Sequence, residues 1–241
     1  MKITAISDLH GFLPKNIKKC DVVCIAGDIF PLDIQTNTIK CVSWFCLDFK
    51  PWAESLPCDR VIFIAGNHDF MLQRIGLSHP ESWSGSFIAD WVMLQLLVEH
   101  FDNTKLVYLC DSSYEYKGKT FYGSPWCPVL KNWAFYGDDE YLEERFNKIP
   151  DKLDVLITHC PPQIGDVGKV LDKDNRNYRK DFGCKQLAAA ISNKDIKWVI
   201  SGHIHSGEHN VIKYQDRMNI VNVSIKDENY KVNYKPFTFE I

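Results

Sequence analysis

The stretch Arg60–Asp69 reads Arg-Val-Ile-Phe-Ile-Ala-Gly-Asn-His-Asp. Its first six residues are largely apolar and rich in β-branched side chains, which predicts a buried strand. Gly66 then ends the run, and polar side chains follow at the carboxyl end of the strand, where ligands bind in α/β sheets. Asn67 offers a neutral oxygen to a metal ion, His68 can move protons near neutral pH, and Asp69 is placed to orient His68. The alternative is a Gly-Asn turn with a surface histidine.

Composition limits the classes of protein to consider. The chain has 241 residues, of which 45% are hydrophobic, enough for one α/β domain over residues 1–241 with a sizeable core. The net charge of −3 argues against a general nucleic-acid binder, which would carry a basic face. A phosphate substrate is still compatible with this charge if metal ions supply the positive charge, and a nucleic acid therefore stays open as a substrate.

The cysteines and the first residues suggest a cytoplasmic protein. The chain has nine cysteines, an odd number without a C-x-x-C pair, and we interpret them as reduced core thiols. Residues 1–7 lack the apolar region of a signal peptide. No stretch reaches the ~18 apolar residues of a membrane span. The sequence leaves the oligomeric state open.

Four other predicted strands end in the same kinds of polar group. These groups are Asp8 and His10 after residues 2–6, Asp28 after residues 21–26, His159 after residues 154–158, and His203 and His205 after residues 197–201. Asp8 and His10 alternate along the chain, so both can face one ion. Each motif alone could be a capping acid or a surface histidine. Their repetition at successive strand ends favours a shared site on loops held by a rigid sheet.

The number and type of these groups suggest two metal ions. Nitrogen and carboxylate ligands without thiolate suit Mn, Fe, Zn or Ni. They are too many for one ion with open positions, and they suit two ions ~3.5–4 Å apart that share a carboxylate. Two divalent ions outweigh the charges of Asp8, Asp28 and a bridging hydroxide, so the site attracts a phosphoryl anion. The hydroxide would attack phosphorus, and His68 would protonate the leaving oxygen.

Aromatic residues near the middle of the chain are candidates for substrate binding. Trp126, Trp133 and Phe135 could stack a nucleobase. The alternative is that Trp126 packs its proline-rich loop into the core. Residues 70–86 have no clear period and are predicted as a loop, whereas residues 87–101 form a strongly apolar predicted helix.

Taken together, the motifs D-x-H, G-D, G-N-H-D, T-H and G-H-x-H resemble the calcineurin-like metallophosphoesterase family. The resemblance implies an α/β fold in which two β-sheets form a sandwich flanked by helices, in four αββα layers. It also implies ligand roles for the motif residues. One ion would take Asp8, His10 and His205, the other would take Asn67, His159 and His203, and Asp28 would bridge them.

Three further stretches look like the MPPED (metallophosphoesterase-domain-containing) branch of that family. They are Tyr122–Trp126, Thr158–Pro162 and Gly202–Gly207. Some members of the branch have Gly at the first histidine of the last motif, and this chain keeps His203. The branch is associated with phosphodiester substrates, including cyclic nucleotides, and with Mn²⁺. The resemblance thus implies a phosphodiesterase of small diesters or nucleotides with two divalent ions, Mn²⁺ favoured over Fe, Zn, Ni or Mg.

Other functions of the same fold are a phosphomonoesterase, a nuclease and a non-catalytic metal-binding scaffold. Some relatives of the fold, such as a retromer subunit, bind partners instead of substrates. His68 favours an enzyme, because a scaffold needs no free acid beside its ligands. In the catalytic reading His68 and Asp69 act in the reaction, while Asn67, Trp126 and Trp133 contact the substrate.

Overall fold

The side chains of strand β2 (Val22–Ala26) alternate between two hydrophobic cores. Val22, Cys24 and Ala26 lie in one core, and the two residues between them lie in the other. The whole strand is buried, so its sheet has to be covered on both faces. One face is covered by helices and the other by a second sheet.

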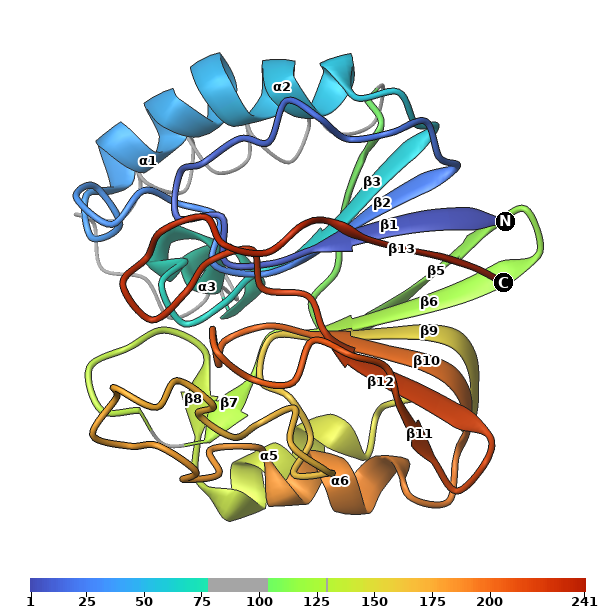
Figure 1. Cartoon of the computed structure of the whole chain (residues 1–241). Coiled ribbons are helices and arrows are strands. Elements are labelled where there is room, and N and C mark those ends of the chain that lie inside the picture. The colour runs from blue at the N-terminus through green and yellow to red at the C-terminus, as the bar shows by residue number, and fades with distance from the viewer. Residues whose placement is uncertain (78–103, 129) are drawn as a thin grey trace.

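The computed structural model describes residues 1–77, 104–128 and 130–241, and Figure 1 shows four layers in it. Two sheets face each other, with α1 and α2 over the outer face of one and α5 and α6 over the outer face of the other. The core between the sheets includes Ile3, Ile62, Val155 and Ile200. The predicted α/β sandwich flanked by helices is therefore confirmed.

The first sheet has the strand order β13-β1-β2-β3-β4. Besides β2, its strands are β1 (Lys2–Ile6), β3 (Arg60–Ile64), β4 (Leu106–Tyr108) and β13 (Phe237–Glu240). Strands β1 to β4 run parallel, and β13 pairs antiparallel with β1. The carboxyl ends of β1, β2 and β3 consequently meet at one edge of the sheet.

The second sheet has the order β11-β12-β10-β9-β6-β5. Its strands are β5 (Ser112–Tyr116), β6 (Lys119–Ser124), β9 (Lys152–Thr158), β10 (Asp195–Ser201), β11 (Ile212–Tyr214) and β12 (Met218–Asn222). The four central strands are parallel, and the two outer strands are antiparallel to their neighbours. A short parallel pair, β7 (Cys127–Pro128) and β8 (Tyr136–Gly137), lies beside this sheet.

The helices are short and cover the outer faces. They are α1 (Thr38–Trp44), which continues through Phe45–Phe49 into α2 (Lys50–Ser55), then α3 (Phe70–Leu77), α5 (Asp139–Phe146) and α6 (Lys185–Ile191). At α5 the side chain of Asp138 accepts a hydrogen bond from the N–H of Tyr141 at 3.0 Å, a typical N-cap. Among the described residues, no helix is both long and apolar enough to pass through a bilayer.

The segment after Asp69 differs from the prediction. Residues 70–77 form α3, so the predicted loop is wrong over this part. Met71 and Leu72 are buried in the core, and this packing stabilises a helix that has no clear period in the sequence. The rest of the predicted loop, residues 78–86, and most of the predicted helix at 87–101 lie outside the described residues.

Trp126 is part of the hydrophobic core. Its side chain is 1% exposed, and its ring makes edge-to-face contacts with Phe135 and Tyr141. The indole Nε1–H donates to Asp111 Oδ2 at 2.8 Å. Because a ring enclosed in this way has no face free for a nucleobase, the prediction that Trp126 binds substrate is wrong, and the core-packing alternative is correct. Phe135 is also completely buried.

Replacing Trp126 should therefore reduce stability. Trp126→Ala should lower the free energy of unfolding by ~3–5 kcal/mol, because it empties a large buried volume. Trp126→Phe keeps a ring but removes the donor to Asp111, and it should cost ~1–3 kcal/mol. Urea denaturation of the two variants and the wild type measures both values. An unchanged unfolding midpoint in Trp126→Ala would contradict the packing described here.

Candidate metal centre

Polar side chains that follow the carboxyl ends of five strands, three in the first sheet and two in the second, lie close together. The first sheet contributes Asp8 and His10 after β1, Asp28 after β2, and Asn67 and His68 after β3; the second contributes His159 after β9, and His203 and His205 after β10. The structure thus brings together all the metal ligands predicted from the sequence. They form two neighbouring groups with Asp28 between them.

The first group consists of Asp8, His10 and His205, each of which has a ligand atom within 4.8 Å of the others'. His205 Nε2 lies 3.6 Å from Asp8 Oδ1. The other ring nitrogen, Nδ1, is 2.8 Å from the carbonyl oxygen of Asp227. A proton on Nδ1 donates to that carbonyl, and Nε2 is then left as a free lone pair. Metal-bound histidines are usually oriented by such a second hydrogen bond.

The second group consists of Asn67, His159 and His203. Asn67 Oδ1 lies 2.9 Å from His159 Nε2 and 2.9 Å from His203 Nδ1. His159 Nδ1 is 2.8 Å from the carbonyl oxygen of Ala26, so the ring donates there and turns Nε2 toward Asn67. An amide oxygen and a ring nitrogen at this distance can share a proton or, in its place, a cation.

Asp28 lies between the two groups. Its Oδ1 is 3.4 Å from His159 Nε2, and its Oδ2 is 3.6 Å from His10 Nε2. The N–H of His68 donates to Oδ1 at 2.9 Å and fixes the orientation of the carboxylate. The two oxygens therefore face different groups, as a bridging carboxylate requires.

The two aspartates are charged although they are buried. Burial alone would raise the pKa of each carboxyl, but neighbouring imidazoles reverse this effect. His205 holds the pKa of Asp8 below its usual range, and His159 and His68 hold the pKa of Asp28 well below its usual range. Both groups are therefore carboxylates at neutral pH and available to a cation.

The imidazoles divide into neutral and charged ones. Burial lowers the pKa of His10 to about 4 and that of His203 to about 3, so both rings are neutral at pH 7 and have lone pairs for a metal. At His159 burial also opposes the charge, but Asp28 overcomes it and raises the pKa to about 10. The proton on His159 thus compensates the buried carboxylates, and a cation at the same place would replace it.

His10 provides a direct test of whether a metal fits this site. Both of its ring nitrogens are buried and have no hydrogen-bond partner among the described residues. A buried polar atom without a partner costs ~1–3 kcal/mol, and a metal ion would remove this cost. The nitrogen, carboxylate and amide donors are also the types that divalent transition metals take. The residues therefore fit a metal centre.

The partner of His68 is not the one expected. His68 Nδ1 lies 2.6 Å from Gln35 Oε1, and His68 Nε2 lies 3.8 Å from Asp28 Oδ2. The carboxylate of Asp69 instead accepts hydrogen bonds from the backbone N–H groups of Ile29 and Gly66, at 2.9 Å and 2.8 Å, and from that of Phe30. The prediction that Asp69 orients His68 is therefore wrong: Asp69 ties the loops after β2 and β3 together, and Gln35 contacts the ring.

Several ligand residues have strained backbones. The φ angles of Asp8, His10, Asp28 and His203 are 58°, 42°, 54° and 68°, in a region that costs non-glycine residues ~1–3 kcal/mol. Gly66 has a different constraint. A Cβ atom there would lie 2.6 Å from His159 Cε1 and would also overlap the carboxylate of Asp28, so glycine is needed for the two sheets to bring these groups together.

A pocket of about 220 Å³ opens onto this centre. Asp28, Asn67, His68, His203, His205, Leu130, Trp133, Glu228 and Tyr230 line it. The ring of Trp133 lies 4.3 Å from that of His68, so Trp133 borders the pocket beside this histidine. No sequence motif marks Tyr230 or Gln35, because both lie in irregular segments. Tyr230 packs edge-on to His10 and His205.

Comparisons with known proteins agree with this geometry. The family model described as calcineurin-like phosphoesterase matches residues 1–207. The human metallophosphoesterase domain-containing protein 1 is 28% identical over 257 residues, covering 100% of this chain and 71% of its own length. A Caenorhabditis elegans protein of the UPF0046 group is 29% identical over 246 residues. That match covers 100% of this chain and 81% of the C. elegans protein.

Among solved structures, the phosphopantetheinyl hydrolase of Mycobacterium tuberculosis has a similar fold. The TM-score is 0.51 at 14% identity, with 93% of this chain and 89% of that chain covered. At this identity the likeness concerns the fold alone.

A methyl group at Gly66 should disturb metal binding. Gly66→Ala should displace Asp28 and His159 and weaken the binding of Mn²⁺ by ~10–100-fold, the usual effect of losing support around a metal site. Isothermal titration calorimetry with Mn²⁺ measures it. Gly118→Ala is the matched control, because its φ is +70° but nothing lies within 4 Å of the added carbon. Mn²⁺ affinity equal to wild type in Gly66→Ala would mean that the ligands do not depend on this close approach.

Proposed function

Since the chain belongs to the calcineurin-like phosphoesterase family, a family of metal-dependent hydrolases, we propose that it hydrolyses phosphodiesters, cyclic nucleotides among them, at a centre of two divalent metal ions. The observation that carries the proposal is the pair of ligand groups on either side of Asp28. A single ion needs only one of them.

In this proposal the ligand groups keep the roles expected from the sequence. Asp8, His10 and His205 would hold one ion, Asn67, His159 and His203 would hold the other, and Asp28, which lies between the groups, would be shared. When bound, the ions would supply positive charge for the phosphate and make an attacking water acidic enough to act near neutral pH. Mn²⁺ is the favoured ion, with Fe, Zn, Ni or Mg as alternatives.

The charge of the site favours a diester over a monoester. Asp8 and Asp28 are the two carboxylates within the ligand groups, so two divalent ions leave a small positive charge after a hydroxide is counted. A phosphodiester is a monoanion and matches that charge. A monoester dianion would need further cationic groups. Among the residues that line the described pocket there is neither lysine nor arginine.

His68 is the proposed general acid. With Nδ1–H donated to Gln35 Oε1 at 2.6 Å, the Nε2 atom is the one left to exchange a proton at the pocket. Burial lowers the pKa of His68, and the negative charge of Asp28 partly opposes this. An anionic substrate in the pocket would favour the protonated ring further. Proton transfer from Nε2 to the leaving oxygen completes the reaction.

Trp133 and Tyr230 are the proposed contacts of the substrate's organic groups. Trp133 borders the pocket at His68, and Tyr230 borders it at His10 and His205. A nucleobase stacked on one such ring gains ~1–3 kcal/mol. Asn67, which lines the same pocket, would contact the phosphate as well as the metal.

The substrate class can be tested with two chromogenic esters. In the presence of Mn²⁺, kcat/KM should be higher for bis-p-nitrophenyl phosphate than for p-nitrophenyl phosphate, and 2′,3′- or 3′,5′-cyclic nucleotides should be hydrolysed. Asp28→Asn should abolish turnover and lower the bound metal, measured by elemental analysis, whereas Asp48→Asn on the exposed surface should change neither. A preference for the monoester would contradict the proposal, as would full activity of Asp28→Asn.

The acid role of His68 predicts a dependence on the leaving group. His68→Ala should keep its metal but lose roughly 10²–10⁴-fold in kcat for a nucleotide, whose alkoxide needs a proton. The loss should be much smaller for p-nitrophenolate, which leaves without one. Gln35→Ala should show a weaker effect in the same direction. Equal losses with both substrates would exclude His68 as the acid.

A further inference from the structure

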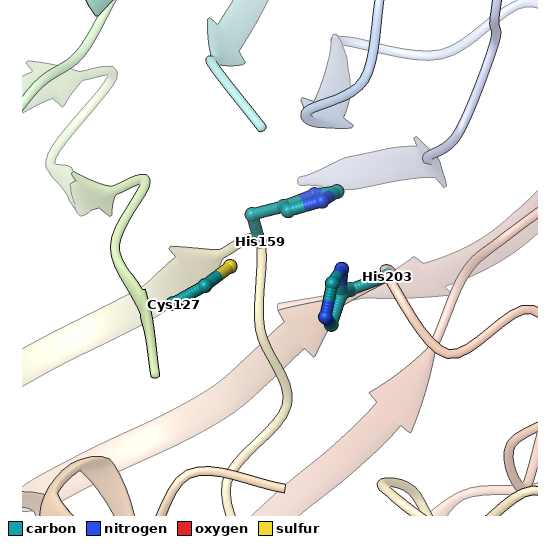
Figure 2. A group of neighbouring side chains, drawn as sticks. All are labelled: Cys127, His159 and His203. Atoms are coloured by element: carbon teal, nitrogen blue, oxygen red, sulfur yellow. The ribbon is translucent and has the colours of Figure 1, made fainter. Parts of the chain in front are cut away.

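Cys127 is the residue beside the centre that neither the motifs nor the family assign. Its sulfur lies within 4.8 Å of a ring nitrogen of His159 and of one of His203, and those two nitrogens are equally close to each other. Figure 2 shows the side chain reaching from β7 toward the two imidazoles. The N–H of Cys127 donates to the carbonyl oxygen of Phe135 at 2.8 Å, so the backbone of this residue is held in place.

The thiol of Cys127 is buried and weakly bound. The residue is completely buried, and its described contacts are the carbonyl oxygen of Pro125, at 3.9 Å, and the neighbouring thiol of Cys160. By contrast, Cys160 donates to carbonyl oxygens at 3.6 Å and 3.7 Å. Cys127 thus has a sulfur next to two metal-ligating imidazoles and little else to bind.

We propose that Cys127 is a metal ligand, and that it makes the Asn67–His159–His203 group a zinc site while the Asp8–His10–His205 group takes Mn²⁺. The inference rests on the metal centre proposed above. Zinc accepts thiolate, imidazole and oxygen ligands together, whereas Mn²⁺ prefers oxygen and nitrogen donors. In the described part of the chain the Asp8–His10–His205 group offers only carboxylate oxygen and imidazole nitrogen. The two groups therefore differ by a thiolate donor, which zinc accepts readily and Mn²⁺ does not prefer.

The cluster is wider than a closed zinc site. Zinc bonds are about 2.3 Å to sulfur and about 2.0–2.1 Å to nitrogen, so in a tetrahedral site the sulfur and the nitrogens lie roughly 3.3–3.6 Å from one another. Here the sulfur and the two nitrogens lie within 4.8 Å of one another, so binding would draw these side chains together around the ion. On binding, the S–H bond of Cys127 breaks, a sulfur–zinc bond forms, and the proton passes to solvent.

The absorption spectrum of the cobalt-substituted protein tests this inference. Co²⁺ occupies zinc sites, and a thiolate ligand gives a sulfur-to-cobalt charge-transfer band in the near ultraviolet. The full chain loaded with Co²⁺ should show this band, and Cys127→Ser should lose it. Cys184→Ser is the matched control, because Cys184 is equally buried and its sulfur caps α6 at the N–H of Leu187, a place where serine is favoured.

Competition between metals gives a second readout. Cys127→Ser should bind Zn²⁺ at least ~10-fold more weakly, while its affinity for Mn²⁺ stays close to wild type, since loss of even a supporting group costs ~10–100-fold. Equal losses for both ions would mean that the substitution disturbs the site in general, and would overturn the sulfur role. So would a charge-transfer band that persists in Cys127→Ser.

X-ray absorption of the zinc-loaded wild type decides the matter if Cys127→Ser does not fold. A sulfur scatterer at about 2.3 Å from zinc supports the inference, and a shell of nitrogen and oxygen alone overturns it. These measurements need no turnover. If the protein shows a zinc–sulfur bond but hydrolyses no phosphodiester, the proposed function fails and the inference stands. If it hydrolyses diesters with no sulfur on zinc, the reverse holds.

Discussion

The carboxylate of Asp28 is buried among the imidazoles of His10, His68 and His159, at nitrogen–oxygen distances of 3.4 to 3.8 Å. A buried negative charge is costly unless a cation or a proton balances it. The surrounding residues are arranged to make that balance possible: His68 donates its backbone N–H, and Gly66 leaves the space in which the carboxylate lies. The charge of Asp28 faces one candidate ligand group through Oδ2 and the other through Oδ1.

The strained backbone at the ligands is maintained by hydrogen bonds between the loops. Asp8, whose φ is 58°, donates its N–H to the carbonyl oxygen of Gly27 at 3.0 Å, and His10 donates to that of Asp28 at 2.9 Å. The N–H of His203 donates to both carboxylate oxygens of Asp8, at 3.1 Å each. The first two bonds join neighbouring loops of the first sheet, and those of His203 join the two sheets, so the sandwich supports conformations that an isolated loop would leave. The positive φ angles of these residues are thus maintained by contacts from the rest of the fold.

The sequence predicted that the candidate ligands lie together, because each one follows a buried strand and parallel strands end at a common edge. It predicted the surroundings of these residues poorly. The partner of His68 is Gln35, which lies 33 residues earlier in an irregular segment, and no periodicity marks such a contact. Trp126 lies in a proline-rich loop and was a candidate for stacking a nucleobase, yet tertiary packing buries its ring. Cys127 looked like one core thiol among nine, since only the fold shows which imidazoles it adjoins.

Each candidate ligand group combines residues of both sheets. Asp8 and His10 follow a strand of the first sheet and His205 follows one of the second, while Asn67 follows the first and His159 the second. An ion bound to either group would therefore oppose separation of the sheets, and its binding energy would add to the stability of the sandwich. Without an ion, the proton on His159 and the hydrogen bonds from backbone to carboxylate compensate the buried charges. The site is thus tied to the fold in both states, because the same residues from both sheets hold the charge balance with a proton or with an ion.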